Sequence, residues 1–277
     1  MASTPKKVIE RFCKTIPRFQ HVLKLAKDRD VNESDTVSIL NDILSEVFGY
    51  NKYLEVTSEF SIRGTYCDLA IKIEDKVHFL LEAKAIGVDL KDNHIKQACD
   101  YGANYGVQWV ILTNSIDWRI YRIRFEQPIA YDLIVSFDFF NINLKNENDL
   151  DLLFLLSKEG LNKNARDDYY EKVQNINKYV IGNLILNDDI LGAIRRELKK
   201  IAENIKVDIN EIEQIIRTQV LKREIIESDE ALVVKNKLNK FYKKPASKKK
   251  PTSKQTETID NQNETVTDKL FREAAES

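Results

Sequence analysis

The sequence predicts an α/β fold in which helices flank a mixed central sheet. Three observations lead to this prediction: strand-like segments between residues 54 and 125, amphipathic helical segments before and among them, and helical periodicity after residue 149. Of the 277 residues, 43% are hydrophobic and 31% are charged, so the chain can bury a sizeable core and keep a charged surface.

Two helices are expected before the sheet. Residues 5–29 carry apolar side chains at helical spacing, namely Val8, Phe12, Ile16, Phe19, Leu23 and Ala26. Pro17 lies inside this run, where a proline is able to kink or split a helix. The second helix follows Asn32, a favourable N-cap residue, and Gly49 is a suitable stop signal.

The central segment alternates between strands and one helix. Strands are expected over 54–63, 66–73, 77–84, 107–113 and 118–125, with a helix over 92–105 and a strand-like run at 131–137. Gly64-Thr65 and the polar residues 74–76 provide turns. The strand over 77–84 is almost entirely apolar, which is typical of a strand buried in the centre of a sheet.

A helical region and a tail complete the chain. Residues 149–226 have helical patterns, a last helix is expected over 229–243, and the composition beyond Lys244 predicts disorder. We therefore expect four parts: a basic N-terminal helix (1–30), an α/β domain (31–148), a helical region (149–243) and a disordered tail (244–277).

Charge and cysteine content limit the possible functions. The formal net charge is −1, but residues 1–30 hold eight Lys or Arg and residues 235–254 hold nine Lys. Both ends could attract phosphate, although a solvated helix face and a solubilising tail explain them more simply. The three cysteines lack zinc-site or disulfide spacing, and no signal core or membrane-length apolar run occurs, so a cytoplasmic protein is expected.

Two acids and a lysine are expected to meet at one strand end. Glu82 and Lys84 project from the same face of their strand, and a hairpin across residues 74–76 brings Asp68 close to Glu82. Two adjacent carboxylates repel each other, and a divalent cation relieves that repulsion. Oxygen ligands of this kind suit Mg²⁺ or Mn²⁺, with the carbonyl oxygen of Ala83 as a further ligand.

This arrangement suits phosphodiester chemistry. A bound ion can polarise a phosphodiester and lower the pKa of its water, while Lys84 orients that water or stabilises developing negative charge. The alternative is a plain Glu82–Lys84 ion pair beside Asp68, which would contribute little to stability. Gln97 and Tyr101, four residues apart on the predicted helix, share a face and could support the site, although they also suit an ordinary helix surface.

Together, Asp68, Glu82-Ala83-Lys84 and Gln97-x-x-x-Tyr101 resemble the PD-(D/E)XK nuclease motif. Residues 31–125 resemble more closely the N-terminal nuclease domain of type I restriction enzyme R subunits. The resemblance implies a restriction-endonuclease-like fold that cuts DNA with Mg²⁺, with metal bound by Asp68 and Glu82, Lys84 as catalytic lysine, and Gln97 and Tyr101 in support. It also implies an acidic residue on the first helix of the domain, for which Glu33 is the candidate, although a charge that only favours the helix N-terminus explains Glu33 equally well. Glu59, between Ser58 and Phe60, is a weaker candidate for an acid of the site.

The chain also departs from a full R subunit. It holds no Gly-x-x-x-x-Gly-Lys-[Ser/Thr] loop, so ATP-driven translocation is not expected. The expected function is a DNA endonuclease of restriction, defence or mobile-element type, with a homodimer as one way to cut both strands. Two alternatives remain: a catalytically silent nucleic-acid-binding module, and a protein–protein scaffold that uses residues 149–243.

Overall fold

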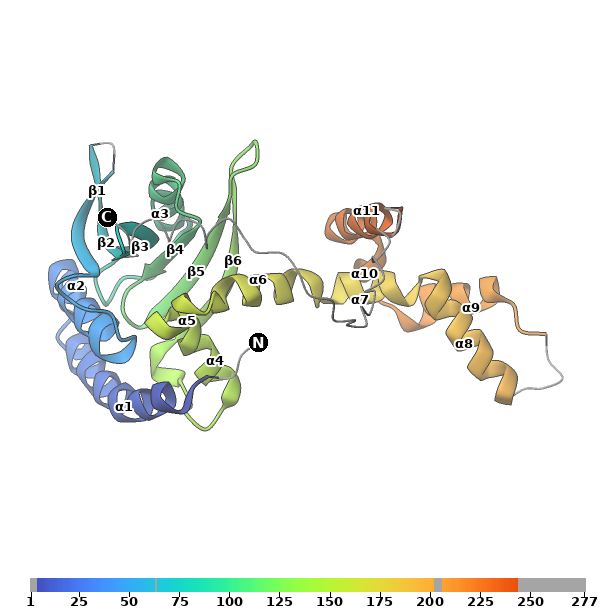
Figure 1. The fold of residues 1–277 in the computed structure, drawn as a ribbon, viewed down its shortest axis with the longest axis horizontal. Helices are drawn as coiled ribbons and strands as arrows, with labels where there is room; N and C mark the ends of the chain where they lie inside the picture. The colour runs from blue at the N-terminus through green and yellow to red at the C-terminus, as the bar shows by residue number, and fades with distance from the viewer. Residues whose placement is uncertain (1–3, 63, 202–205, 244–277) are drawn as a thin grey trace, which may run out of the picture.

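A six-stranded mixed sheet forms the centre of the molecule (Figure 1). The computed structural model describes residues 4–62, 64–201 and 206–243. Strand order follows chain order, and only β3 and β4 pair in parallel among the described strands. The strands are β1 (Val56–Ile62), β2 (Thr65–Ile73), β3 (Lys76–Ala83), β4 (Trp109–Thr113), β5 (Asp117–Arg124) and β6 (Ala130–Asp138). The predicted fold class is confirmed.

The β2–β3 hairpin follows the predicted pairing. Its two-residue turn consists of Glu74 and Asp75, which both have positive φ angles of 48° and 63°. Turns of this kind match the twist of the flanking strands. Leu69 then lies opposite Leu81, and β3 is buried along most of its length, as its apolar sequence predicts.

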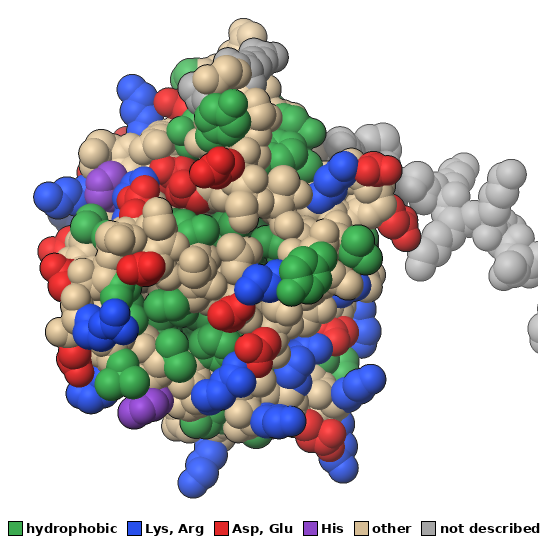
Figure 2. Space-filling view, turned by 90° about the vertical axis from the view of Figure 1, so that its left-hand side faces the viewer, with side chains coloured by type: hydrophobic (Ala, Val, Ile, Leu, Met, Phe, Trp, Pro, Cys, Tyr) green, Lys and Arg blue, Asp and Glu red, His purple; other side chains and the backbone are tan. Residues whose placement is uncertain are grey.

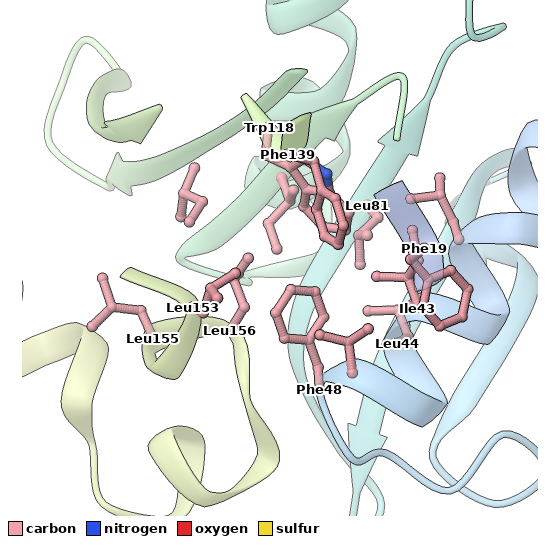
Figure 3. Close-up of a cluster of buried hydrophobic side chains, with 14 of the residues drawn as sticks. Phe19, Ile43, Leu44, Phe48, Leu81, Trp118, Phe139, Leu153, Leu155 and Leu156 are labelled. Atoms are coloured by element: carbon pink, nitrogen blue, oxygen red, sulfur yellow. The ribbon is translucent and has the colours of Figure 1, made fainter. Parts of the chain in front are cut away.

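One face of the sheet is covered by helices that precede it and helices that follow it in the sequence. Helices α1 (Lys6–Asp28) and α2 (Glu33–Asp42), the π-helical turn η1 (Ile43–Val47), and helices α4 (Glu147–Leu156), α5 (Lys158–Asn162) and α6 (Ala165–Asn175) lie around one apolar cluster. Figure 3 shows side chains of α1, η1 and α4 gathered with Leu81 of β3 and Trp118 of β5. The six apolar residues expected on the first helix are all buried. Pro17 does not split that helix, which is continuous.

The opposite face is covered by α3 (Asp92–Tyr105), which lies in the connection between β3 and β4. Its buried residues Ile95, Ala98 and Cys99 contact side chains of β4 and β5. A parallel pair needs a crossover of this kind, because the chain must return to the end of the sheet from which β3 started. The connection therefore brings the start of α3 close to the end of β3.

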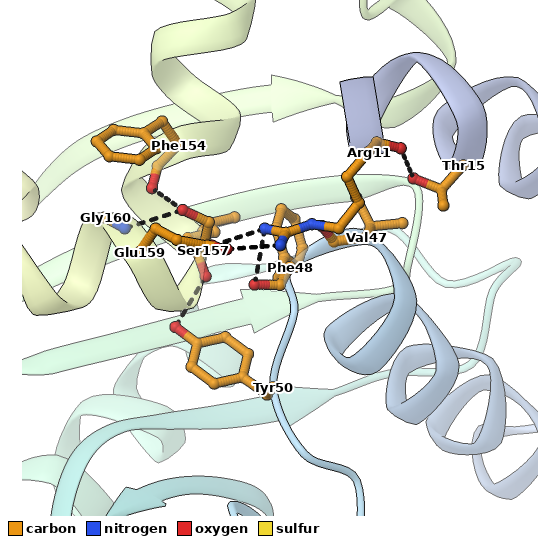
Figure 4. Close-up of polar contacts among 10 residues, drawn as sticks. Arg11, Thr15, Val47, Phe48, Tyr50, Phe154, Ser157, Glu159 and Gly160 are labelled. Atoms are coloured by element: carbon orange, nitrogen blue, oxygen red, sulfur yellow. Dashed lines mark hydrogen bonds and ion pairs between the residues drawn. The ribbon is translucent and has the colours of Figure 1, made fainter. Parts of the chain in front are cut away.

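A bidentate ion pair fastens α5 to α1. Both guanidinium Nη atoms of Arg11 lie 2.7 Å from the carboxylate of Glu159, and its Nε donates to the carbonyl of Val47 (Figure 4). Ser157 caps α5 by accepting from the amide of Gly160. The Arg11–Glu159 pair joins segments that lie 148 residues apart in the sequence.

Charges on the face that carries α1 and α2 are mixed. Figure 2 shows acidic side chains lying among the basic ones. Arg11 pairs with Glu159 and Arg18 pairs with Glu46, so part of the basic charge of α1 is already neutralised. The predicted basic character of residues 1–30 thus does not produce a uniformly basic surface here.

Helices beyond α6 extend away from the sheet (Figure 1). They are α7 (Lys178–Ile185), α8 (Asp188–Ile201), α9 (Ile209–Ile215), the π-helical turn η3 (Ile216–Val220), α10 (Glu224–Glu227) and α11 (Asp229–Lys243). Helices α7, α8 and α9 and the turn η3 contribute to a small apolar cluster around Leu191, Ile212 and Ile216, while α10 and α11 contact α7. The helical prediction for 149–243 is confirmed, the tail 244–277 lies outside the described residues, and the division into four parts stays a prediction. Across the described ranges, no helix has the length and apolar character needed to cross a membrane.

Candidate active site

Asp68 and Glu82 lie on adjacent strands at the same level of the sheet. Leu69 pairs with Leu81, so Asp68 and Glu82 occupy the next facing positions. Side chains alternate along a strand, and their same-face neighbours Ala70 and Leu80 pack together in a cluster that includes Tyr101 of α3. Asp68 and Glu82 therefore belong to the α3 face, and the hairpin brings them together as the sequence predicts.

Glu82 is the most deeply buried acid of this group. Its residue is 2% exposed, its Oε1 accepts a 2.7 Å hydrogen bond from the Lys84 ammonium, and its Oε2 is buried without a hydrogen-bond partner. Burial, followed by the negative charge of Asp68, raises the pKa of Glu82 to about 7, despite the lysine. The carboxylate therefore lacks part of the positive charge or hydrogen bonding that its ionised form needs.

Asp68 is fixed by a backbone contact. Its Oδ2 accepts a 2.7 Å hydrogen bond from the amide of Ala83. Burial raises the pKa of Asp68 above its usual value, against the lowering effects of that bond and of Lys84. Ala83 thus orients one acid through its N–H, while metal ligation through its carbonyl stays a prediction.

Lys84 pairs with two carboxylates and lies near a third, that of Asp68. Its Nζ lies 2.7 Å from Glu82 and 3.9 Å from Oε2 of Glu33, the first residue of α2. Burial lowers the pKa of Lys84, but the bond to Glu82 and the surrounding carboxylates together raise it above its usual value. Three carboxylates and one ammonium carry a formal charge of −2 when all four are ionised, so the group favours an added cation.

Gln97 and Tyr101 contact each other rather than the acids. The side-chain amide of Gln97 donates a 3.1 Å hydrogen bond to the hydroxyl of Tyr101, and Gln97 is exposed. In the described part of the chain, neither side chain makes a hydrogen bond to Asp68, Glu82 or Lys84. Both lie on α3, which covers the face of the sheet that carries the acids. Their supporting role stays a prediction.

Comparison with known proteins adds to this geometry. Residues 40–135 match the family described as Type I restriction enzyme R protein N terminus (HSDR_N). The HSDR_N segment runs from α2 into β6 and includes Asp68, Glu82, Lys84, Gln97 and Tyr101, so the resemblance predicted from the sequence is confirmed. The matched segment begins at residue 40 and therefore does not include Glu33. No curated protein and no solved structure matched the chain.

The HSDR_N segment relates these residues to a restriction-enzyme nuclease family, in which metal dependence is typical. Among residues 4–62, 64–201 and 206–243, no group of three or more His, Cys, Asp or Glu side chains is arranged to hold a metal ion. The unpartnered Oε2 of Glu82 beside Asp68 nevertheless fits a cation that takes only two carboxylates from the protein.

Two further residues lie close to the group. His94, in the first turn of α3, has a lowered pKa because of burial and then the positive charge of Lys84. Glu59 faces Asp68 across β1 and β2, since Ser58 pairs with Leu69 and Phe60 with Cys67, and its negative charge contributes to the raised pKa of Asp68. Sequence periodicity places His94 only roughly toward the site, because side-chain approach depends on how α3 packs.

Glu59 also has an unusual backbone. Its φ angle is +50°, a left-handed conformation that is uncommon for residues other than glycine. The strand ladder skips the Glu59–Asp68 position while its register continues on both sides. The left-handed backbone next to Asp68 therefore adds a structural observation to the weaker candidate Glu59, whose role in the site stays a prediction.

Proposed function

We propose that the protein is a Mg²⁺-dependent DNA nuclease with its catalytic centre at Asp68, Glu82 and Lys84. The single observation that carries this proposal is the buried Oε2 of Glu82, which has no hydrogen-bond partner. Lys84 bonds only the other oxygen of the carboxylate, Oε1. Such a carboxylate destabilises the fold unless a cation or a proton compensates it. A restriction-type match over residues 40–135 supports nuclease chemistry in preference to an unspecific cation site.

Asp68 and Glu82 would hold the ion, with the carbonyl of Ala83 as a third donor. Mg²⁺ is commonly held by one or two carboxylates, and waters and substrate phosphates complete its octahedron. Two carboxylates from the protein are therefore sufficient. Mn²⁺ prefers similar ligands and should substitute. When bound, the ion would supply Lewis acidity to the scissile phosphate and its attacking water.

Lys84 would act on the reacting phosphate. Its ammonium is held by Glu82 and lies within ion-pair distance of Glu33, so it remains protonated and directed toward the acids. A fixed ammonium stabilises the negative charge that develops on the phosphate during hydrolysis. We assign Glu33 to positioning Lys84, and Gln97 and Tyr101 to contacts with the substrate backbone.

The family match favours DNA as the substrate and a role in restriction, defence or mobile-element biology in the cytoplasm. Cutting both strands of a duplex needs two reactive centres or two binding events. A homodimer on DNA would provide two centres and is included in the proposal as the form that makes double-strand breaks.

Plasmid cleavage with Mg²⁺ tests the proposal. Asp68→Asn, Glu82→Gln and Lys84→Met should each lower the nicking rate by about 10²-fold or more, because each removes charge from the centre. Lys72→Ala and Asp75→Asn are matched controls: they break an exposed ion pair at the far end of the same hairpin and should cut like the parent protein. Equal cutting by the site variants and the controls would rule out this centre.

A silent binding module is the alternative outcome. Binding of duplex DNA that survives Glu82→Gln, together with no cleavage in Mg²⁺ or Mn²⁺, would identify a nuclease fold used only for binding. That binding should weaken steeply as salt rises, because phosphate contacts release counterions.

A further inference from the structure

Arg166 is a buried cation far from the candidate active site. It lies in the first turn of α6, is 5% exposed, and stacks over the rings of Phe79 and Trp109 at 4.7 and 5.5 Å. Its Nη1 is buried without a hydrogen-bond partner, and no ion pair joins Arg166 to a carboxylate anywhere in the described ranges. A buried guanidinium without an anion is unfavourable, and ring contacts offset only part of its desolvation.

The neighbouring Arg122 also stacks on aromatic rings, but its charge has an acidic partner. Its guanidinium lies over the rings of Trp109 and Tyr170, and its Nη1 also pairs with Asp167 at 3.2 Å. Arg166 stacks in a similar way but has no such acid. Burial accordingly lowers the pKa of Arg166, which indicates that its charge is poorly compensated within the chain.

A pocket of about 500 Å³ lies beside Arg166. Its polar walls include Lys76, His78, Gln108 and Asn164, and its apolar walls include Trp109 and Phe125. Asn164 precedes α6 in a left-handed conformation and makes no side-chain capping bond, so the amides at the start of this helix keep their positive partial charge. Asp167 is the acid in the lining, and its charge is already paired with Arg122.

This pocket is separate from the candidate active site. Lys76 and His78 belong to the first half of β3, whereas Glu82 is near its end. Glu82 lies four positions after His78 along the strand, a distance of roughly 13 Å at 3.3 Å per residue. The two sites thus lie toward opposite ends of the same strand.

We propose that this pocket binds a phosphomonoester, with Arg166 as the principal cation. Lys76, His78 and the amides at the start of α6 would complete the anion site, and the guanidinium would meet the phosphate oxygens in its own plane. The pocket is larger than a phosphate ion requires, and Trp109 and Phe125 offer aromatic surface on which a base can stack. A free mononucleotide and the 5′-phosphate end of a DNA strand share this chemistry.

Binding measurements on the full chain test the proposal. Calorimetry without divalent metal, at pH 7, would compare AMP, adenosine, and one DNA oligonucleotide with and without a 5′-phosphate. We expect AMP to bind at least about tenfold more tightly than adenosine, because a charged hydrogen-bonded group is added. A preference for the phosphorylated oligonucleotide over AMP would assign the site to DNA ends. The reverse preference would assign it to a free nucleotide.

Arg166→Met is the decisive variant. Methionine keeps an unbranched apolar stem against Phe79 and removes the uncompensated charge, so the fold should be retained. We expect AMP binding to weaken by about tenfold or more. Lys76→Ala, at an exposed pocket position, should weaken it severalfold without affecting the core, and Lys72→Ala, outside the pocket, is the matched control. Failure of AMP to bind, or equal binding by Arg166→Met, Lys76→Ala and the parent, would overturn the proposal.

The outcome is independent of the proposed nuclease activity. Asp68→Asn should leave AMP binding unchanged, and Arg166→Met should leave the binding of Mg²⁺ unchanged. Loss of plasmid cleavage alone therefore bears on the active site, and loss of AMP binding alone bears on the pocket.

Discussion

Glu82 makes the stability of the metal-free protein depend on pH. Its pKa rises from 4.5 to about 7 on folding, so between these values the folded state holds a proton that the unfolded state has released. Stability is therefore fully present below pH 4.5 and is lost as pH rises through 7, by an amount of order 3 kcal/mol. Urea unfolding in EDTA at pH 5 and pH 8 should show this loss, and Glu82→Gln should abolish most of it. If Glu82→Gln lost as much stability between pH 5 and pH 8 as the parent protein, a group other than Glu82 would cause the effect.

The same proton should compete with Mg²⁺. A metal ion needs the ionised carboxylate, so binding below pH 7 must displace the proton from Glu82. The apparent affinity for Mg²⁺ should fall by up to about tenfold per pH unit below 7 and level off above it. Calorimetric titration at pH 6, 7 and 8 measures this. A flat affinity over that range would contradict the assignment of Glu82 as a ligand.

At the residue scale, the sequence predicts the positions of side chains that are set by strand register. It does not predict positions that depend on how helices pack over the sheet. Asp68, Glu82 and Lys84 meet because β2 and β3 pair across a two-residue turn, and that pairing can be predicted from alternation. The orphaned oxygen of Glu82 and the burial of Arg166 depend on helices packed over the sheet. An arginine in a helical segment carries no signal of its own that it will be buried.

At the element scale, the entry into α5 depends on Gly160. A Cβ added there would lie 1.9 Å from the carbonyl oxygen of Phe154, which belongs to rigid backbone. Gly160→Ala should therefore cost about 1–3 kcal/mol through overpacking, measured by chemical denaturation. Gly192→Ala in α8 is the control: its nearest neighbour is the flexible end of Arg196 at 4.0 Å, and alanine should be neutral or stabilising there. Equal stabilities for the two variants would contradict this explanation.

Element types were predictable where periodicity is strong. Strand positions agree to within about two residues, because the apolar alternation ends at turn residues. The π-helical turn at Ile43–Val47 was not predictable, since its apolar residues also suit an α-helix. The long helical stretch after 149 is broken at Ser157, Asn164 and Asn177, each of which precedes a new helix. Residues of this type are common N-caps, so they were an available signal.

At the scale of the whole molecule, the outer helices should be dispensable for the candidate site. Helices α7, α8 and α9 and the turn η3 have their own small cluster, α10 and α11 contact α7, and the main cluster ends with residues of α6. A chain ending at residue 177 should fold and bind Mg²⁺ within about threefold of the full chain, because no residue of the site is removed. Circular dichroism and calorimetry would check this. A truncated chain that folds but does not bind Mg²⁺ would show that the outer helices contribute to the site.

The sequential strand order of the sheet also affects the order in which the protein can assemble during synthesis. Each strand pairs with its nearest neighbours along the chain, so the acids of β2 and β3 can be brought together as soon as residue 84 has left the ribosome. The apolar stripe of α1 must wait for α4 to α6, more than 100 residues later, before its cover is complete. The nascent chain can therefore bring its acids together early, whereas the apolar stripe of α1 is covered completely only after α4 to α6 have been made.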